Sequence, residues 1–317
     1  MQKFSKENLR ITKFRLNLPA TDLLLPCKVD EWLQIAVRNQ IAEIELQGPV
    51  NYKLPRFLFR AKSLRSLCWT NLVIPYYEAV DLVSLERLEL WRVVIEERML
   101  LHIVSSCPLL KDLSLSNCSG FKNIVIPCRS KLEDLFIEGD LPIDGKVILE
   151  TSSLRSFEYI PDDDNNPWPI ISNRGLLRNL RVITVYSVSI TNKALAELLP
   201  ELDSLEKLEI AYCDMLTSIK ISNTQLKQIC LEGCYRLLNV VIDAPCLKEF
   251  KYEGNIIPSL SITNSSQANC SIHICIRPSY FEVGGFCKLK KLLTGLNRCN
   301  VLRITLPINL FKVSQMS

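Results

Sequence analysis

Cysteine and histidine are the side chains of this protein that could bind a metal ion or act as a nucleophile and its base. The chain has 13 cysteines but only two histidines, His102 and His273. A zinc site needs several ligands at suitable spacing, whereas the nearest cysteine groupings, within 230–234 and 270–275, are single pairs. We therefore expect no metal site and no cofactor, and we interpret the cysteines as reduced and mostly structural.

Sequence patterns that signal catalysis are absent. The chain contains no G-x-S-x-G, G-x-x-x-x-G-K-[ST] or H-E-x-x-H motif, and its ten glycines form no phosphate-binding loop. His102 falls in an expected helix and His273 in an expected terminal strand, and we interpret both as structural residues and not as catalytic bases. The sequence therefore predicts a protein that is not an enzyme.

Composition and charge limit the classes of partner. Lys and Arg number 38 against 34 Asp and Glu, and the net charge of +4 is too small to indicate a nucleic-acid binder or a polybasic membrane anchor. No stretch of 18 uncharged apolar residues occurs, and the first 16 residues contain no apolar run of signal-peptide length. We expect no membrane association, and we expect the protein to be cytoplasmic or nuclear.

The elements that position the polar side chains follow from a repeat. An apolar-x-x-apolar-x-apolar phrase recurs ten times, at intervals of 21 to 26 residues that fall within the leucine-rich-repeat class. The copies are IAEIEL at 41, LRSLCW at 64, LERLEL at 85, LKDLSL at 110, LEDLFI at 132, LRSFEY at 154, LRVITV at 180, LEKLEI at 205, LKQICL at 226 and LKEFKY at 247, with a weaker VLRITL at 301.

This repeat predicts an α/β fold, a leucine-rich-repeat solenoid. The last residues of each phrase alternate, so the fourth and sixth should enter the core from a short parallel strand. Stacked strands should form a curved parallel sheet on the concave face, with helices and irregular turns on the convex face. We expect a capping segment at residues 1–40, the repeats at 41–260, and irregular repeats with a second cap at 261–317.

Segments between the phrases suggest further elements. Residues 95–106 and 191–199 have helical spacing, and DEWLQIAVRNQ at 30–40 predicts a capping helix that starts at Asp30 and packs Trp32, Ile35 and Ala36. Other expected elements are an extra strand at 14–18, an exposed loop at 161–169 that includes Trp168, strand segments around a polar turn in 261–276, and a helix at 286–296. Cys118, Cys213 and Cys234 take the ninth repeat position, where Asn or Cys is structural.

The third, fifth and seventh positions of each phrase should face outward and offer a binding surface. Across the ten phrases they hold eleven acids and three bases, together with aromatic residues near the middle. The candidate protein-binding residues are Arg87, Glu89, Trp91, Asp112, Asp134, Phe136, Glu138, Glu158, Val182, Tyr186, Lys207 and Glu209. An acidic surface with aromatics favours a protein or peptide partner with basic and apolar groups, and it disfavours nucleic acid.

A structural interpretation of the same residues stays open at this point. The second phrase position is mostly basic, so the acids could be ordinary solvated charges that are neutralised by this basic rim. The aromatic residues could be covered by the loop at 161–169 or by neighbouring side chains. The rim residues are Arg65, Lys111, Arg155, Arg181, Lys227 and Lys248, with Glu86, Glu133 and Glu206 among them.

The chain resembles plant F-box/leucine-rich-repeat proteins over roughly residues 12–255. The resemblance rests on KFRLNL, VDEWLQIAVRNQIAEIEL, LPRFLFRAKSLRSLCWTNLVI, SSCPLLKDLSLSNC and SLEKLEIAYCDMLTSIKISNTQLKQICLEGC followed by APCLKEFKYEG. It implies the substrate-recognition part of a cullin-RING (SCF) ubiquitin ligase receptor, in which an F-box binds the ligase adaptor and the repeats hold the substrate. We find no F-box in these residues, so adaptor binding is expected only if an F-box is supplied upstream. The alternative is a stand-alone repeat scaffold with no link to a ligase.

Overall fold

The computed structural model describes residues 11–18, 26–142, 144–162, 168, 170–172, 176–262, 270–277, 285–296 and 299–306. These residues form two compact units. Unit 1 comprises residues 1–154 and 169–173, and unit 2 comprises 155–168 and 174–317. Of the expected loop at 161–169, the structure describes only Pro161, Asp162 and Trp168, and the expected polar turn at 263–269 lies outside the described residues.

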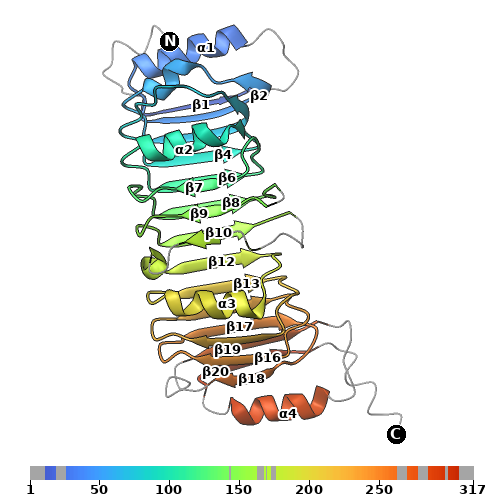
Figure 1. The fold of residues 1–317 in the computed structure, drawn as a ribbon. Helices are drawn as coiled ribbons and strands as arrows, with labels where there is room; N and C mark the ends of the chain where they lie inside the picture. The colour runs from blue at the N-terminus through green and yellow to red at the C-terminus, as the bar shows by residue number, and fades with distance from the viewer. Residues whose placement is uncertain are drawn as a thin grey trace. The chain divides into compact units, whose positions relative to one another are not determined.

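The main sheet of unit 1 is built from the repeat phrases (Figure 1). Each strand that a phrase forms in this unit begins at the third residue of the phrase. The strands, in spatial order and all parallel, are β1 Lys13–Asn17, β2 Glu43–Lys53, β3 Ser66–Ile74, β4 Arg87–Trp91, β6 Asp112–Ser116 and β8 Asp134–Glu138, with β5 Val94–Ile95 paired to β3. The extra strand expected at 14–18 is confirmed by β1.

Equal phrase positions lie opposite one another across neighbouring strands, which explains why one repeat cannot fold alone. Leu88 of β4 pairs with Leu113 of β6, and Leu90 pairs with Leu115. These four side chains are each only 1% exposed. Burying a leucine contributes about 1.5–3 kcal/mol, and the stacking supplies the apolar partner that a single repeat lacks.

The layer behind the main sheet of unit 1 contains more than helices and turns. It has α1 Pro26–Arg38, the 3-10 helix η2 Arg56–Arg60 and α2 Glu97–Ser106, as expected in type. It also has a second parallel sheet of β7 Ile124–Ile126, β9 Val147–Leu149 and β11 Ile170–Ser172. The predicted solenoid, with helices behind the curved sheet, is confirmed. The short strands of this layer are an addition that was not predicted, and three-residue stretches rich in β-branched residues form them where neighbouring repeats align.

Unit 2 has the same plan. Its main sheet, in spatial order, is β10 Ser156–Ile160, β12 Val182–Tyr186, β13 Lys207–Ala211, β15 Gln228–Glu232, β17 Glu249–Gly254, β19 Ser271–Ile276 and β20 Val301–Thr305. Behind it lie η3 Leu176–Asn179, α3 Asn192–Leu198, η4 Leu199–Glu201, a sheet of β14 Ser218–Ser222, β16 Asn239–Asp243 and β18 Ser259–Ile262, and α4 Gly285–Gly295. The phrase VLRITL forms β20, and SIHICI forms an additional strand of the repeat series.

The capping helix α1 differs from its prediction. It starts at residue 26, so Asp30 lies inside the helix and does not cap it. The buried stripe consists of Val29, Leu33 and Ala36 at helical spacing, while Trp32 is only half-buried. The Asp30 carboxylate instead accepts a hydrogen bond from the Tyr52 hydroxyl. By contrast, α3 follows the prediction, because Thr191 caps it by accepting the Ala194 N–H at 3.2 Å.

A tight turn follows most strands and reverses the chain toward the second layer. The eighth phrase residue takes a left-handed conformation at Arg92, Asn117 and Tyr212, with φ of 53°, 53° and 55°. Gly233 takes the same place at φ 61°, where an added Cβ would lie 2.5 Å from the Tyr212 ring. At the ninth position, the expected structural cysteines donate to backbone carbonyls, as Cys213 Sγ does to Ala211 O at 3.3 Å. The turns thus fix where each outward-facing side chain stands.

Candidate protein-binding face

The strand face is the surface formed by outward side chains of the main-sheet strands. On β4, Arg87, Glu89 and Trp91 are exposed, while Leu88 and Leu90 between them are buried. The same alternation holds along β6 and β8. The predicted outward orientation is confirmed for these three strands, whereas Thr70, Thr184 and Ala211, at the fifth or seventh position of other phrases, are buried. The use of the outward side chains in binding stays a prediction.

In unit 1, seven candidate residues share three adjacent strands, and we call this group the N-terminal patch. Its members are Arg87, Glu89, Trp91, Asp112, Asp134, Phe136 and Glu138. The pairing register places them in rows, because Arg87 lies opposite Asp112, which in turn lies opposite Asp134. Ser114 separates Glu89 from Phe136, so small hydroxyl side chains leave space between the larger groups.

Trp91 is the exposed large apolar side chain of this patch, whereas Phe136 is half-buried. Trp91 is 44% exposed at the end of β4. The Arg92 guanidinium lies over its ring at 4.9 Å from the centroid, in a cation–π contact that holds the ring on one side. An oriented, accessible tryptophan is the kind of side chain on which protein interfaces concentrate binding energy.

The charges of the N-terminal patch are only partly paired. Arg87 Nε contacts Asp112 Oδ2 at 3.1 Å and Glu89 Oε1 at 3.9 Å. The hydrogen bond with Asp112 and its negative charge raise the pKa of Arg87. At 56% and 36% side-chain exposure, solvent screening limits this ion pair to well under about 1 kcal/mol. Glu138 has no ion pair within the part of the chain that the structure describes.

In unit 2, the five candidate residues lie on β10, β12 and β13 and are largely engaged with one another. The Tyr186 hydroxyl donates to Glu209 Oε1 at 2.6 Å, and Lys207 Nζ contacts Glu209 Oε2 at 2.8 Å. Burial opposes ionisation of Glu209, but the hydrogen bonds from Lys207 and Tyr186 outweigh it and lower its pKa. Burial, followed by the contact with Glu209, raises the pKa of Tyr186. Glu158 and Val182 stand half-buried beside this group.

Two contributors to this network were not predicted. Tyr212 stands at the eighth phrase position, outside the alternation, and its ring lies 6.3 Å from that of Tyr186. Its hydroxyl donates to Glu232 at 2.8 Å. Arg277 follows β19 and contacts Glu232 at 3.8 Å and Glu253 at shorter range. Recognising SIHICI as a repeat phrase would have placed Arg277 beside these acids.

The residues of the basic rim lie where the phrases place them, and several of the bases form ion pairs with acids of the same rim. In unit 1, Lys111 contacts Glu133 at 3.6 Å, and in unit 2 Glu206 contacts Lys227 at 2.7 Å and Arg181 at 3.6 Å. The predicted excess of acids on the outward positions is reduced, because strands outside the ten phrases add bases. On β1, Lys13 contacts both Glu43 and Glu45.

With this geometry established, comparison with known proteins gives the family. The family model described as "At1g61320/AtMIF1, LRR domain" matches residues 1–142 and 169–301. The chain belongs to this leucine-rich-repeat family. The resemblance to plant F-box/leucine-rich-repeat proteins is also confirmed, as the relatives show.

Two relatives of this leucine-rich-repeat chain come from Arabidopsis thaliana. The FBD-associated F-box protein At5g22730 is 27% identical over 208 residues, which cover 59% of this chain and 44% of the relative. The F-box/FBD/LRR-repeat protein At1g13570 is 25% identical over 239 residues, covering 72% and 54%. The chain thus spans about half the length of these curated relatives. A solved internalin of Listeria monocytogenes aligns with a TM-score of 0.41 at 14% identity, over 87% of this chain and 96% of the internalin.

The two histidines of this leucine-rich-repeat chain lie in regular secondary structure. His102 lies in α2 with Nδ1 at 3.1 Å from the Tyr77 carbonyl oxygen, and His273 lies in β19. Among the described residues, no group of three or more His, Cys, Asp or Glu side chains is placed to hold a metal ion. None of the described helices is long and apolar enough to cross a membrane.

Proposed function

We propose that this chain is a non-enzymatic protein-binding scaffold, and specifically the substrate-recognition part of an F-box-type SCF ubiquitin ligase receptor. The observation that carries the binding role is Trp91, an exposed ring beside the Arg92 guanidinium on a strand face rich in acidic side chains. Such a side chain stabilises an interface by transferring apolar area out of water without a large loss of rotamer freedom.

The N-terminal patch suggests the chemistry of the partner. Glu89, Asp112, Asp134 and Glu138 favour a protein or peptide with basic groups, and Trp91 with Phe136 favours apolar groups between them. Phosphate-rich nucleic acid would be repelled by these acids. We propose no cofactor and no membrane contact for this role.

The ligase assignment is supported by the relatives, whose names include F-box proteins. An F-box would connect the captured substrate to the ligase adaptor, and we propose adaptor binding only where an F-box is supplied upstream of these repeats. We also propose that residues 1–40 cap the repeats at 41–260 and that 261–317 form the second cap. The free thiols, for example Cys107, whose pKa burial raises to about 12, fit a reducing compartment such as the cytoplasm or nucleus.

The alternative is a stand-alone scaffold that sequesters a partner without a ligase. Co-purification of the full-length gene product with the ligase adaptor separates the two. Recovery of a stoichiometric adaptor complex is expected for a receptor, and its absence from a folded, partner-binding protein would leave the stand-alone scaffold.

Charge reversal tests the binding face itself. The triple variant with Glu89→Lys, Asp112→Lys and Asp134→Lys should weaken capture of a basic partner, measured by pull-down or calorimetry. Glu150→Lys is the matched control, because Glu150 is exposed beyond β9 in the second layer. Equal loss in both variants would point to non-specific charge attraction rather than to the N-terminal patch.

A further inference from the structure

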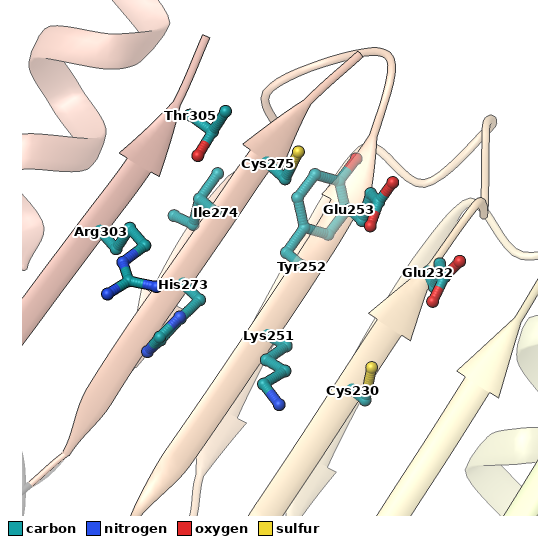
Figure 2. A pocket seen from close by; sticks show the side chains of 10 residues that line it. All are labelled: Cys230, Glu232, Lys251, Tyr252, Glu253, His273, Ile274, Cys275, Arg303 and Thr305. Carbon is teal, nitrogen blue, oxygen red and sulfur yellow. The ribbon is translucent and has the colours of Figure 1, made fainter.

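A cavity of about 190 Å³ opens on the strand face of unit 2, and none of the candidate protein-binding residues lines it (Figure 2). Its walls are outward side chains of four adjacent strands, β15, β17, β19 and β20, which lie opposite one another in the pairing register. Tyr252 and Ile274, which alternate into the core, contribute to its floor. The site is therefore built from rigid strands and not from a loop.

Three bases line one side of this cavity in a single row, which we call the base row. Lys251 of β17 lies opposite His273 of β19, and His273 lies opposite Arg303 of β20. Adjacent strands are about 4.8 Å apart, so three nitrogen-bearing side chains project within about 10 Å of one another. Figure 2 shows the three side chains following one another across the strands.

The base row keeps positive charge that the protein does not neutralise. Lys251 Nζ contacts Glu249 Oε1 at 3.0 Å. His273 and Arg303, by contrast, have no ion pair or side-chain hydrogen bond within the described part of the chain. Three cationic or donor groups therefore share one carboxylate at close range.

Glu232 and Glu253, the acids on the other side of the cavity, pair with residues outside the base row. Glu232 accepts a hydrogen bond from the Tyr212 hydroxyl at 2.8 Å and contacts the Arg277 guanidinium. The Arg277 Nε contacts the Glu253 carboxylate. Tyr212 directly follows β13 and Arg277 directly follows β19, so both partners lie at the ends of the strands. Arg277 therefore draws both carboxylates away from the base row and offsets part of their charge.

The two cysteines of the cavity add no negative charge. Burial, with a contribution from Glu209 and Glu232, raises the pKa of Cys230 to about 11. Burial and then Glu253 raise the pKa of Cys275. Both thiols are neutral at pH 7, and they leave the base row as the feature that selects a ligand.

We propose that this cavity binds a phosphoryl group through Lys251, His273 and Arg303. A phosphoryl group offers three oxygens and close to two negative charges, so it can accept from three donors on three strands, whereas one arginine already saturates a carboxylate. The proposal goes beyond the protein-binding function of the N-terminal patch and does not depend on it, because its ligand is anionic and its residues belong to unit 2.

The two histidines of the chain make the test direct. In the full chain, the imidazole NMR signals of His273 and His102 are assigned with His273→Gln and His102→Gln, and inorganic phosphate, sodium acetate and an O-phosphoserine tripeptide are titrated at constant ionic strength and pH. The His273 signal should shift saturably with phosphate or with the phosphopeptide, while the His102 signal stays constant. The tighter of these two ligands identifies whether the source is free phosphate or a phosphorylated chain.

Variants separate a built site from general charge attraction. Arg303→Gln should weaken phosphate binding by roughly fivefold or more, and Lys251→Gln gives an independent second change. Arg65→Gln, which removes an exposed arginine of unit 1 outside the N-terminal patch, should leave the titration unchanged. The proposal is overturned if the His273 shift is linear in phosphate, if acetate binds as tightly as phosphate, or if Arg303→Gln and Lys251→Gln both titrate like the unchanged protein with unaltered melting temperatures.

Discussion

The N-terminal patch of unit 1 and the tyrosine-rich strands of unit 2 are built from the same phrase, yet they use their outward positions differently. Trp91 reaches solvent with the Arg92 guanidinium over its ring, whereas Tyr186 and Tyr212 donate their hydroxyls to Glu209 and Glu232. An outward side chain that is held by its own neighbours has less to offer a partner. The comparison teaches that projection from the strand is necessary for binding, while local pairing decides which projecting groups remain available.

Replacing the exposed tryptophan should give the largest effect on binding. Trp91→Ala is expected to weaken partner binding by about 2 kcal/mol or more, roughly thirtyfold, because it removes the apolar anchor of the patch. The same change should alter the free energy of unfolding by less than about 1 kcal/mol, since the ring is already partly exposed. Calorimetric affinity and urea unfolding measure the two. If Trp91→Ala instead lost much stability and kept its affinity, Trp91 would be a structural residue and the N-terminal patch would not be the binding region.

Changing the tyrosine-linked acid of unit 2 should affect stability rather than binding. Glu209→Gln is expected to lower the free energy of unfolding by about 1 kcal/mol at pH 7, because it weakens hydrogen bonds from Lys207 and Tyr186. The folded-state pKa of Glu209 is lowered, so its contribution is complete above the unfolded-state pKa and is lost as pH falls through the folded value. Urea unfolding of both proteins from pH 7 to pH 3 should therefore show a shrinking difference.

Tyr186→Phe provides the control for this experiment, since it removes one donor but keeps the carboxylate. A Glu209→Gln difference that stays constant down to pH 3 would show that ionisation of Glu209 does not contribute to folding.

A single charge reversal in the N-terminal patch should have a smaller effect on binding. Glu89→Lys is expected to weaken the binding of a basic partner by about 1 kcal/mol. The loss should be larger at low salt, because salt screens exposed charges. The equivalent reversal in unit 2, Glu158→Lys, should change affinity less. Equal effects in affinity titrations at two salt concentrations would remove the distinction between the two regions.

Breaking one ion pair of the basic rim should have the smallest effect of these changes, and that effect should be on stability. Lys227→Ala removes the 2.7 Å contact with Glu206, in which the lysine side chain is 42% exposed, and should cost at most about 0.5 kcal/mol of unfolding free energy. Thermal and urea unfolding provide the measurement. A loss of several kcal/mol would mean that rim pairs, and not the stacked leucines, hold the repeats together.

The fold could be predicted because its signal is local and repeated. The fourth and sixth phrase positions, such as Leu88 and Leu90, fix both the strand and the side that it buries. The second-layer strands were missed because stretches such as Ile124–Ile126 are too short to stand out without their aligned neighbours. Strand β19 was missed as a repeat because Asn269 stands where the phrase has its first apolar residue.

The candidate site was predictable in orientation but not in pairing. Alternation places Glu209 and Tyr186 on the outward side, yet their 2.6 Å hydrogen bond depends on strands 23 residues apart in sequence. Arg277 and Tyr212 fell outside the counted positions, so the balance of acids and bases in unit 2 could not be derived from the phrases alone. Long side chains reach across a strand spacing, and only the register reveals which ones meet.

Site-specific photo-crosslinking tests the central claim, partner capture by the strand face, most directly. A photoreactive p-benzoylphenylalanine is placed at Trp91, at Phe136 and, as the control, at Leu101, which is 37% exposed on α2 in the same unit. After irradiation in plant cell extract, residues 91 and 136 should crosslink to the same protein with basic and apolar segments, and residue 101 should not. Crosslinks to that protein from residue 101 alone would contradict the account.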